Sequence, residues 1–345
     1  MPEKCGVLVF AEQEDGRIHN VTYELLGKGR ELADRLRNNL CAVLLGYNLE
    51  NEAKELIYYG ADKVYLFDHP SLKEFDVIRY KHNIVNLVKE IQPRIFLIGA
   101  TRIGRSLAPR IAAALKTGLT ADCVDLDLDE EGNLVQIRPA FSGNIMAQIK
   151  TRTKPQMATV RYKIMKPVNR DPKRKGEIIR KEVGKLGETG IKVLDKLGAG
   201  EVNISEAEVI VSAGRGLRNP EDFKLIKEVA DLLGGVVGSS RPLVDAGWIG
   251  KEHQVGFSGN IVKPKVYIAL GISGSPQHLF GMRDSDIIIA VNKDPSAPII
   301  NVSDYYVIGD LYEILPQLIC ELKKIKKSEG HDPLSYKFRL RQHCR

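Results

Sequence analysis

Aromatic side chains are scarce in this chain of 345 residues: they make up 6% of it and include a single Trp. Proteins that bind single-stranded nucleic acid stack its bases on such rings, so the composition argues against that class. The net charge is +7, from 51 basic and 44 acidic residues, and no nucleic-acid reader motif is present. We interpret the two basic stretches, residues 163–185 and 323–345, as a solvated linker and tail.

The chain also has few cysteines and no long apolar runs. None of the five cysteines forms a Cys-x-x-Cys pair, which argues against a zinc or iron–sulfur centre. No apolar run approaches the roughly 20 residues that span a bilayer, and the first ten residues lack the features of a signal peptide. Isolated cysteines on apolar segments are typical of reduced proteins. We therefore expect a cytoplasmic protein with no metal and no membrane segment of its own.

The usual nucleotide-binding motifs are incomplete. The glycines at 214 and 216 form half of a G-x-G-x-x-G motif, whose third glycine is replaced by Asn219, and no P-loop is present. Neither the common dinucleotide fold nor a nucleoside triphosphatase is supported. The seven histidines are scattered, and only His278 lies beside a glycine-rich loop. The residues alone therefore predict no catalytic set.

Alternating apolar runs and amphipathic stretches predict an α/β fold with two domains, each with a parallel sheet. In an N-terminal α/β domain, residues 1–162, we expect strands at 6–11, 41–45, 64–67 and 95–98 and helices at 23–37, 51–59, 76–91 and 103–116. Three further segments with alternating polarity, 134–139, 144–151 and 157–162, predict antiparallel strands that complete this domain.

A polar, lysine-rich segment at 163–203 predicts a linker with one short extended piece near 178–183. The second α/β domain is expected at 204–327 and a basic tail at 328–345. Its expected strands are 209–212, 236–238, 266–270, 287–291 and 299–302, and its expected helices are 220–233 and 311–324.

Glycine is concentrated in the second domain, where residues 214–281 hold 12 of the chain's 31 glycines. Several of these glycines directly follow expected strands, and loops at the carboxyl ends of parallel strands line ligand crevices. Glycine there lets the backbone approach a ligand closely and suits a phosphate or pyrophosphate. Arg215, Arg218 and Arg241 add permanent positive charge that can meet phosphate or a reduced, anionic ring.

Longer motifs in both domains resemble the alpha subunit of electron transfer flavoproteins. In the second domain they are Ser-Ala-Gly-Arg-Gly (212–216), Ser-Ser-Arg-Pro (239–242), Gln-Val-Gly (254–256), the run at 266–278 that ends in Gln-His, and Ile-Ile-Ile-Ala-Val-Asn-Lys-Asp-Pro (287–295). In the first domain they lie at 10–12, 101–110 and 138–144. The resemblance covers the whole chain except the tail.

The resemblance implies that the second domain binds FAD. Arg241 would lie near the flavin ring, the Ser258 hydroxyl would face the flavin N5 atom, and His278 would lie near the pyrimidine carbonyl. Asn292, Asp310 and Leu311 would hold the ribose and adenosine end. The full set implied to line the cofactor is Arg215, Ser240, Arg241, Gln254, Val255, Gly256, Phe257, Ser258, Ser273, Gly274, Ser275, Pro276, Gln277, His278, Asn292, Asp310 and Leu311.

The implied roles agree with the chemistry of a one-electron carrier. A cation and a hydrogen-bond donor stabilise a ring that gains negative charge, and an imidazole with its ordinary pKa of about 6.5 would respond to pH near neutrality. The loop at 257–260 and the residues 275 and 276 depart from the family's pattern. Phe257 stands where Gln is frequent, Ser258 keeps the hydroxyl of the family's Thr, and Pro276 lacks a backbone N–H. We expect these changes to alter the flavin's potential and to preserve binding.

The resemblance also implies partners. The family's alpha subunit works as a heterodimer with a beta subunit, and its redox partners include flavin dehydrogenases and a quinone reductase. In a second, bifurcating version the beta subunit holds another FAD that NADH reduces, and one electron goes to ferredoxin. The alternative of another class is an NAD(P)-binding oxidoreductase that acts alone, which the glycine-rich loops would also suit.

Overall fold

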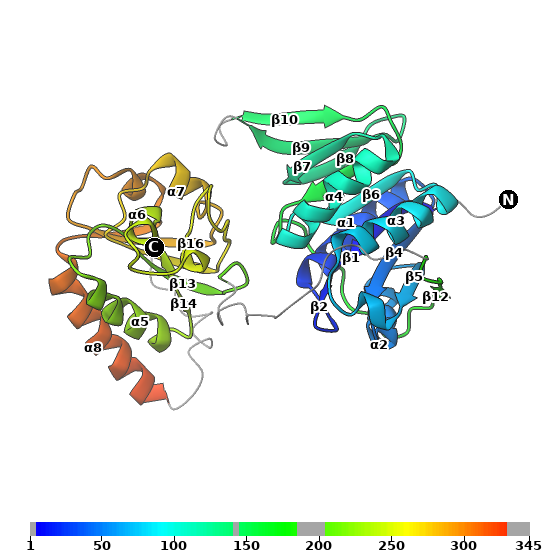
Figure 1. The fold of residues 1–345 in the computed structure, drawn as a ribbon. Coiled ribbons are helices and arrows are strands. Elements are labelled where there is room, and N and C mark those ends of the chain that lie inside the picture. The colour runs from blue at the N-terminus through cyan, green and yellow to red at the C-terminus, as the bar shows by residue number, and fades with distance from the viewer. Residues whose placement is uncertain (1–4, 141–144, 185–203, 330–345) are drawn as a thin grey trace. The chain divides into compact units, whose positions relative to one another are not determined.

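The computed structural model describes residues 5–140, 145–184 and 204–329. The chain divides into two compact units, Met1–Leu194 and Asp195–Arg345, each with its own hydrophobic core (Figure 1). Each unit is a mixed α/β structure with a parallel main sheet, as the sequence predicts. Residues 185–203 of the predicted linker and the predicted tail from residue 330 onward lie outside the described residues.

The first unit is built on a seven-stranded sheet with the order β12-β5-β4-β1-β6-β11-β7, in which all neighbours are parallel. Its strands are β1 (Cys5–Ala11), β4 (Asn39–Gly46), β5 (Lys63–Asp68), β6 (Ile95–Gly99), β7 (Leu119–Cys123), β11 (Gln156–Val160) and β12 (Glu177–Arg180). The helices are α1 (Asn20–Arg35), α2 (Glu50–Tyr58), α3 (Val77–Ile91) and α4 (Arg102–Leu115). The short elements are β2 (Gln13–Glu14), β3 (Arg17–Ile18) and η1 (Pro70–Leu72).

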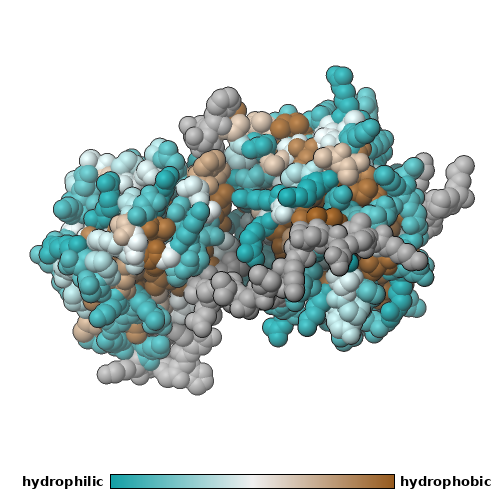
Figure 2. Space-filling model, viewed as in Figure 1, coloured by the Kyte–Doolittle hydropathy of each residue, from teal (hydrophilic) through white to brown (hydrophobic). Residues whose placement is uncertain are grey.

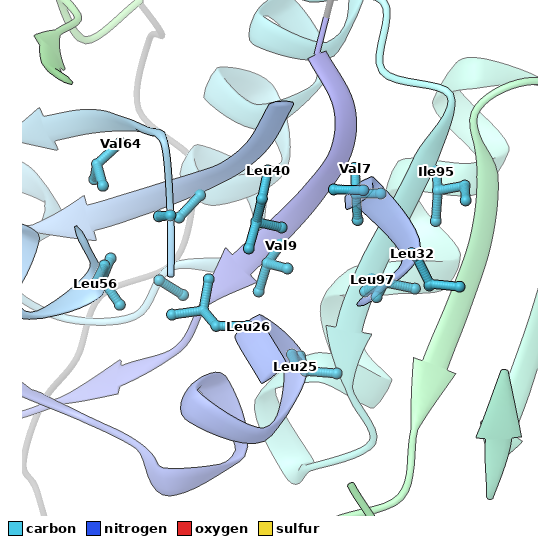
Figure 3. Close-up of a cluster of buried hydrophobic side chains, with 14 of the residues drawn as sticks. Val7, Val9, Leu25, Leu26, Leu32, Leu40, Leu56, Val64, Ile95 and Leu97 are labelled. Atoms are coloured by element: carbon cyan, nitrogen blue, oxygen red, sulfur yellow. The ribbon is translucent and has the colours of Figure 1, made fainter. Parts of the chain in front are cut away.

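Strand β1 is buried on both faces, and its side chains alternate between two cores. Val7 and Val9 meet side chains of α1, among them Leu25 and Leu32, in the core drawn in Figure 3. Leu8, between the two valines, belongs to the opposite core, which also contains residues of α3 and α4. Helices therefore cover both faces of this sheet, as expected of a parallel sheet.

Two predictions for the first unit need correction. Residues 157–162 were expected to form an antiparallel strand, but β11 lies inside the parallel sheet, between β6 and β7, and all five of its residues are buried. The antiparallel prediction holds for 134–139 and 144–151, which form β9 (Leu134–Ala140) and β10 (Ile145–Lys150). They belong to a separate antiparallel sheet whose third strand, β8 (Asp125–Leu128), was not predicted.

Residues 163–184, which the composition predicts to be linker, pack against the first unit. The carboxylate of Glu24, on α1, accepts hydrogen bonds from the backbone N–H groups of residues 163, 164 and 165 at 3.1–3.2 Å. Further along, β12 pairs in parallel with β5. Polar composition misleads here because this segment is held by backbone hydrogen bonds at the sheet edge and by a buried carboxylate, and needs few apolar side chains.

The second unit has a five-stranded parallel sheet with the order β14-β13-β15-β16-β17. The strands are β13 (Val209–Ala213), β14 (Val236–Ser239), β15 (Val266–Leu270), β16 (Ile287–Asn292) and β17 (Tyr305–Ile308). The helical elements are η3 (Pro220–Asp222), α5 (Phe223–Leu232), α6 (Arg241–Asp245), η4 (Lys251–His253), α7 (Pro276–Phe280), η5 (Pro298–Val302) and α8 (Leu311–Glu329).

The fifth strand of this sheet is not where the sequence predicts it. Residues 299–302 form the 3-10 helix η5, in which Pro298 occupies the first turn and Ile299 is fully buried. The strand is β17, four exposed residues at the edge of the sheet. An apolar run beside a proline-initiated turn resembles a buried strand in sequence, whereas an edge strand carries no such signal.

On the face that Figure 2 shows, the surface of each unit is largely hydrophilic, with scattered apolar patches. The exposed apolar side chains include those of Ile145 and Met146 on β10, of Phe257, and of Tyr305 and Tyr306 on β17. Among the residues that the structure describes, no helix combines the length and apolarity needed to cross a bilayer.

Candidate functional site

A cavity of about 510 Å³ lies at the carboxyl ends of the strands in the second unit. Strand β13 has its sequence neighbour β14 on one side and β15 on the other, so the order of connections changes direction between β13 and β15. Ligands of open α/β sheets bind at such a point. The lining residues are Arg215, Gly216, Leu217, Arg218, Ser240, Pro242, Gly271, Ile272, Ser273, Gly274, Ser275, His278, Asn292, Lys293, Gly309, Asp310 and Leu311.

Close backbone packing forms the floor of this cavity. The N–H of Gly216 donates to the carbonyl of Gly271 at 3.0 Å, and a Cβ added at Gly216 would lie 2.7 Å from the Gly271 Cα atom. Gly271 and Gly274 have φ angles of +62° and +84°, which favour glycine. A Cβ at Gly274 would lie 2.4 Å from the backbone nitrogen of Ile299. These glycines let backbone, and not side chains, face the cavity.

The charged residues of the cavity are mostly basic. Arg215, Arg218 and Lys293 line it together with one acid, Asp310. The Arg218 guanidinium lies 4.2 Å from the centroid of the Tyr312 ring, and its Nη2 atom is 2.9 Å from Asp310 Oδ2. Three cations beside glycine backbone can hold a phosphate-bearing ligand.

Asp310 and Asn292 hold the structure around the cavity as well as lining it. Asp310 Oδ1 accepts a hydrogen bond from the Tyr312 backbone N–H at 2.8 Å, in the first turn of α8. Asn292 is buried at the end of β16; its Nδ2 donates to the Ile272 carbonyl at 2.8 Å, and its Oδ1 accepts from the Asp294 N–H at 3.0 Å. Both ribose-binding candidates therefore also fix the loops that carry them.

His278 lies on α7 with only 5% of its surface exposed. Its Nε2 atom is 3.0 Å from the Tyr267 hydroxyl, and its buried Nδ1 atom has no hydrogen bond of ordinary geometry in the described part of the chain. Burial lowers the pKa of His278 to about 4, and the backbone of Val255 opposes this effect. The expectation that His278 changes charge near neutral pH is therefore corrected: the imidazole is neutral there.

The loop at 254–258 does not line the cavity, but it is tied to the helix that carries His278. The Phe257 N–H donates to the Gln277 carbonyl at 2.8 Å, and a Cβ at Gly256 would lie 3.0 Å from the same oxygen. Gln254 is buried, and its Nε2 donates to Ser258 Oγ at 3.0 Å. The Phe257 side chain is 66% exposed and meets the Phe280 ring edge-on at 5.2 Å.

Of the residues implied for the cofactor, nine line the cavity: Arg215, Ser240, Ser273, Gly274, Ser275, His278, Asn292, Asp310 and Leu311. Eight do not: Arg241, Gln254, Val255, Gly256, Phe257, Ser258, Pro276 and Gln277. Arg241 begins α6, where its exposed side chain donates from Nε to Asp245 Oδ2 at 3.0 Å. It is thus next to the lining residues Ser240 and Pro242.

Sequence reasoning missed several lining residues as cofactor contacts, including Pro242, Gly271, Ile272, Lys293 and Gly309. Gly271, Lys293 and Gly309 each directly follow a strand, at β15, β16 and β17. Gly271 is one of the glycines that follow expected strands, although it was not among the residues implied for the cofactor, and the same position after a strand could have marked Lys293. Gly309 was not accessible in this way because β17 itself was not predicted.

The donor set fits a flavin dinucleotide. Glycine backbone and three cations suit a pyrophosphate, Asp310 offers a carboxylate to ribose hydroxyls, and the unpartnered Nδ1 atom of His278 is a buried polar group that lacks a ligand.

Comparisons with known proteins agree with a flavin site in the second unit. Residues 7–186 match the family model described as electron transfer flavoprotein domain, and residues 203–283 match the one described as electron transfer flavoprotein FAD-binding domain. The electron transfer flavoprotein subunit alpha of Thermoanaerobacterium thermosaccharolyticum is 51% identical over 94% of this chain and 100% of its own length. The subunit of that name from Megasphaera elsdenii is 46% identical, over 94% of this chain and 98% of its own.

One relative has a more specific name. The lactate dehydrogenase (NAD(+),ferredoxin) subunit LctC of Acetobacterium woodii is 43% identical over 96% of this chain and 80% of its own. Two family models and full-length relatives lead to one conclusion. The chain belongs to the electron transfer flavoprotein alpha-subunit family, and its second unit is an FAD-binding domain of that family.

Proposed function

We propose that this chain is the alpha subunit of a heterodimeric electron transfer flavoprotein, which it forms with a beta subunit. One observation carries the proposal: the cavity of the second unit combines a glycine floor, three cations and the buried His278, inside a domain of the FAD-binding family. Its role is to pass single electrons from a flavin or NADH donor to an acceptor, which is a dehydrogenase, a quinone reductase or ferredoxin. The chain's Cys5, Cys41 and Cys123 are free and buried, which supports a location in a reducing compartment such as the cytoplasm.

The chain's own residues bind and orient the cofactor. Arg215, Arg218 and Lys293 neutralise the phosphates, and Asp310 holds the ribose end through its carboxylate. FAD, when bound, supplies a ring that accepts and releases electrons one at a time. The neutral imidazole of His278 offers one N–H, and Arg241 adds a positive charge beside the cavity. Both groups favour negative charge on a neighbouring ring.

A bifurcating complex is the second candidate, and the name of one relative supports it. The relative whose name includes NAD(+) and ferredoxin is similar to this chain over 96% of this chain and 80% of its own length. In such a complex the beta subunit would hold a second FAD that NADH reduces. One electron would pass to ferredoxin and the other through the FAD of this chain to a higher-potential acceptor.

The test is the number and kind of nucleotides released from the purified heterodimer, with the beta subunit from the same genome. One FAD and one AMP per heterodimer would identify a single-flavin carrier and remove the bifurcating candidate. Two FAD would support bifurcation, with NADH-driven reduction of ferredoxin as the next measurement. If no flavin is released and NAD(P)H binds instead, the proposal is wrong and an oxidoreductase that acts alone takes its place.

A further inference from the structure

Three polar side chains are buried in succession in the second unit, and one of them, His278, lines the cavity. Ser212 is the next-to-last residue of β13 and has no exposed surface, Tyr267 lies fully buried on β15, and His278 lies on α7. The Tyr267 hydroxyl is 3.0 Å from His278 Nε2. Ser212 Oγ is buried without a hydrogen bond of ordinary geometry. Burial raises the pKa of the Tyr267 phenol, and the nearby Ser212 hydroxyl opposes this effect.

A buried phenol needs a hydrogen-bond partner, and the position of its single proton decides which tautomer His278 adopts. If the Tyr267 hydroxyl donates to Nε2, the neutral imidazole carries its proton on Nδ1. If Nε2 donates to the phenol, Nδ1 is a bare acceptor. The two arrangements have opposite consequences, because a donor stabilises negative charge in the cavity and a lone pair repels it.

Two features of the site favour the first arrangement. Ser212 can donate to the phenol oxygen, which leaves the phenol proton for Nε2. In the described part of the chain, His278 Nε2 is also the one partner of ordinary geometry that the Tyr267 hydroxyl meets. A fully buried phenol must place its proton on an acceptor, and Nε2 is the acceptor within reach.

We propose that Tyr267 is a positioning residue that holds His278 as its Nδ1–H tautomer through the sequence Ser212, Tyr267, His278. The side chain that lines the cavity thereby presents a fixed N–H donor, and not a lone pair, to the ligand. This inference rests on the proposed function, since it deepens the role of His278 toward the flavin. The inference assigns a role to Tyr267, which its burial alone would mark as a residue of the hydrophobic core.

The experiment compares the heterodimer, with 15N-labelled histidine, before and after removal of FAD. The resonances of His278 are identified by their loss in His278→Asn. In the wild type we expect a protonated Nδ1 and an unprotonated Nε2, with and without FAD. An Nε2–H tautomer in the wild type would overturn the proposal without any variant.

Tyr267→Phe keeps the ring that fills the core and removes only the hydroxyl. We expect it to move His278 away from the Nδ1–H tautomer and to shift the FAD reduction potential downward. Ser212→Ala should shift both readouts in the same direction by a smaller amount. The matched control is Tyr80→Phe in the first unit: this phenol is also buried and donates to the carbonyls of Leu45 and Leu72, and its loss should change neither readout.

The readouts separate the possible failures. If Tyr267→Phe leaves the His278 resonances unchanged, Tyr267 does not set the tautomer and the inference is wrong. If the tautomer changes and the potential does not, the link to the flavin is wrong, although the proposed function stands. If Tyr267→Phe fails to fold, Ser212→Ala and the wild-type tautomer decide the question. Absence of bound flavin in the wild type would contradict the proposed function and leave the tautomer measurement valid.

Discussion

The guanidinium of Arg218 lies over the ring of Tyr312, 4.2 Å from its centroid. The two residues are 94 positions apart and are held together by more than this stacking. The Arg218 backbone N–H donates to the Tyr312 hydroxyl at 2.8 Å, and that hydroxyl donates to Asp222. The stack therefore fixes a cation in the lining of the cavity, although the Arg218 side chain is 64% exposed. An arginine held in this way loses little further freedom when it meets a phosphate or a base.

We predict that Arg218→Ala weakens FAD binding by about tenfold, a loss of about 1.4 kcal/mol in binding free energy. Arg218→Lys should recover part of the affinity, since it keeps the charge and loses the planar stack. The measurement is quenching of FAD fluorescence on addition to the flavin-free heterodimer. Arg283→Ala, which removes an exposed arginine of the same unit, is the control. Equal affinities for Arg218→Ala and the control variant would show that the stack has no role in binding.

The glycine floor supplies the second prediction. Gly274→Ala would place a Cβ 2.4 Å from the Ile299 backbone nitrogen, which itself donates to the Ser273 carbonyl at 3.1 Å. We expect this clash to displace the loop, to cost about 1–3 kcal/mol of stability beyond the strain of positive φ, and to abolish stable FAD retention. Flavin absorbance per protein after gel filtration measures the loss.

Gly234→Ala is the matched control for this change. Gly234 has a similar φ of +64°, but a Cβ there would meet nothing within 4 Å. Only the left-handed strain remains, about 1–2 kcal/mol, and we expect FAD to be retained. If Gly274→Ala also kept its flavin, close packing at the cavity floor would not be a requirement for binding.

The strands that support the cavity could be predicted because burial leaves a plain signal. Residues 266–270 were predicted with the bounds of β15, since a strand covered on both faces is a continuous apolar run. The edge strand β17 was missed because Tyr305–Ile308 are all exposed and depend on β16 for their pairing. β11 was assigned the wrong orientation because strand direction depends on which neighbour it joins, information that a local pattern does not hold.

Part of the site could likewise be predicted from the sequence and part could not. Glycines, arginines and serines after strands mark a phosphate-binding region in the sequence, and the structure places many of them around one cavity. The sequence gives no sign that Tyr267 belongs to the site, because an aromatic residue within an apolar strand is typical of a hydrophobic core. Its relation to His278, 11 residues away, depends on how α7 packs against the sheet. The low pKa of His278 was likewise hidden, since the sequence does not show its burial.

Arg241 leads to a third prediction. Its side chain is exposed and bound to Asp245, and it adjoins the cavity without lining it. If Arg241 acts on the flavin by charge, Arg241→Gln should lower the reduction potential, because a cation that favours the reduced, anionic ring is lost. Arg241→Lys keeps the charge and should retain most of the wild-type potential. Spectroscopic redox titration of the heterodimer measures both, and an unchanged potential in Arg241→Gln would rule out this role.

Glu12 gives a pH-dependent prediction for the first unit. It follows β1, is 4% exposed, and accepts a hydrogen bond from Thr101 Oγ1 at 2.6 Å. Burial raises the pKa of Glu12 to about 7, although the Thr101 hydroxyl opposes the change. In the unfolded chain the same carboxyl titrates near 4.3. Between these values the folded protein keeps a proton that the unfolded chain has lost, so the free energy of unfolding falls as pH rises, by about 4 kcal/mol in all.

Glu12→Gln removes this titration and keeps an oxygen that can accept from Thr101. The variant should therefore gain stability over the wild type as pH rises from about 4.5 to 7, and the difference should be constant above pH 8. Chemical denaturation at a series of pH values measures it, with Glu182→Gln as the control, because Glu182 is an exposed carboxylate of the same unit and is not among the groups that shift the pKa of Glu12. A stability difference that stays the same from pH 4.5 to 8 would mean that Glu12 is already ionised in the folded protein below pH 4.5. The burial of Glu12 at the end of β1 would then be offset by its neighbours, of which Arg102 is the cation that favours the charged form.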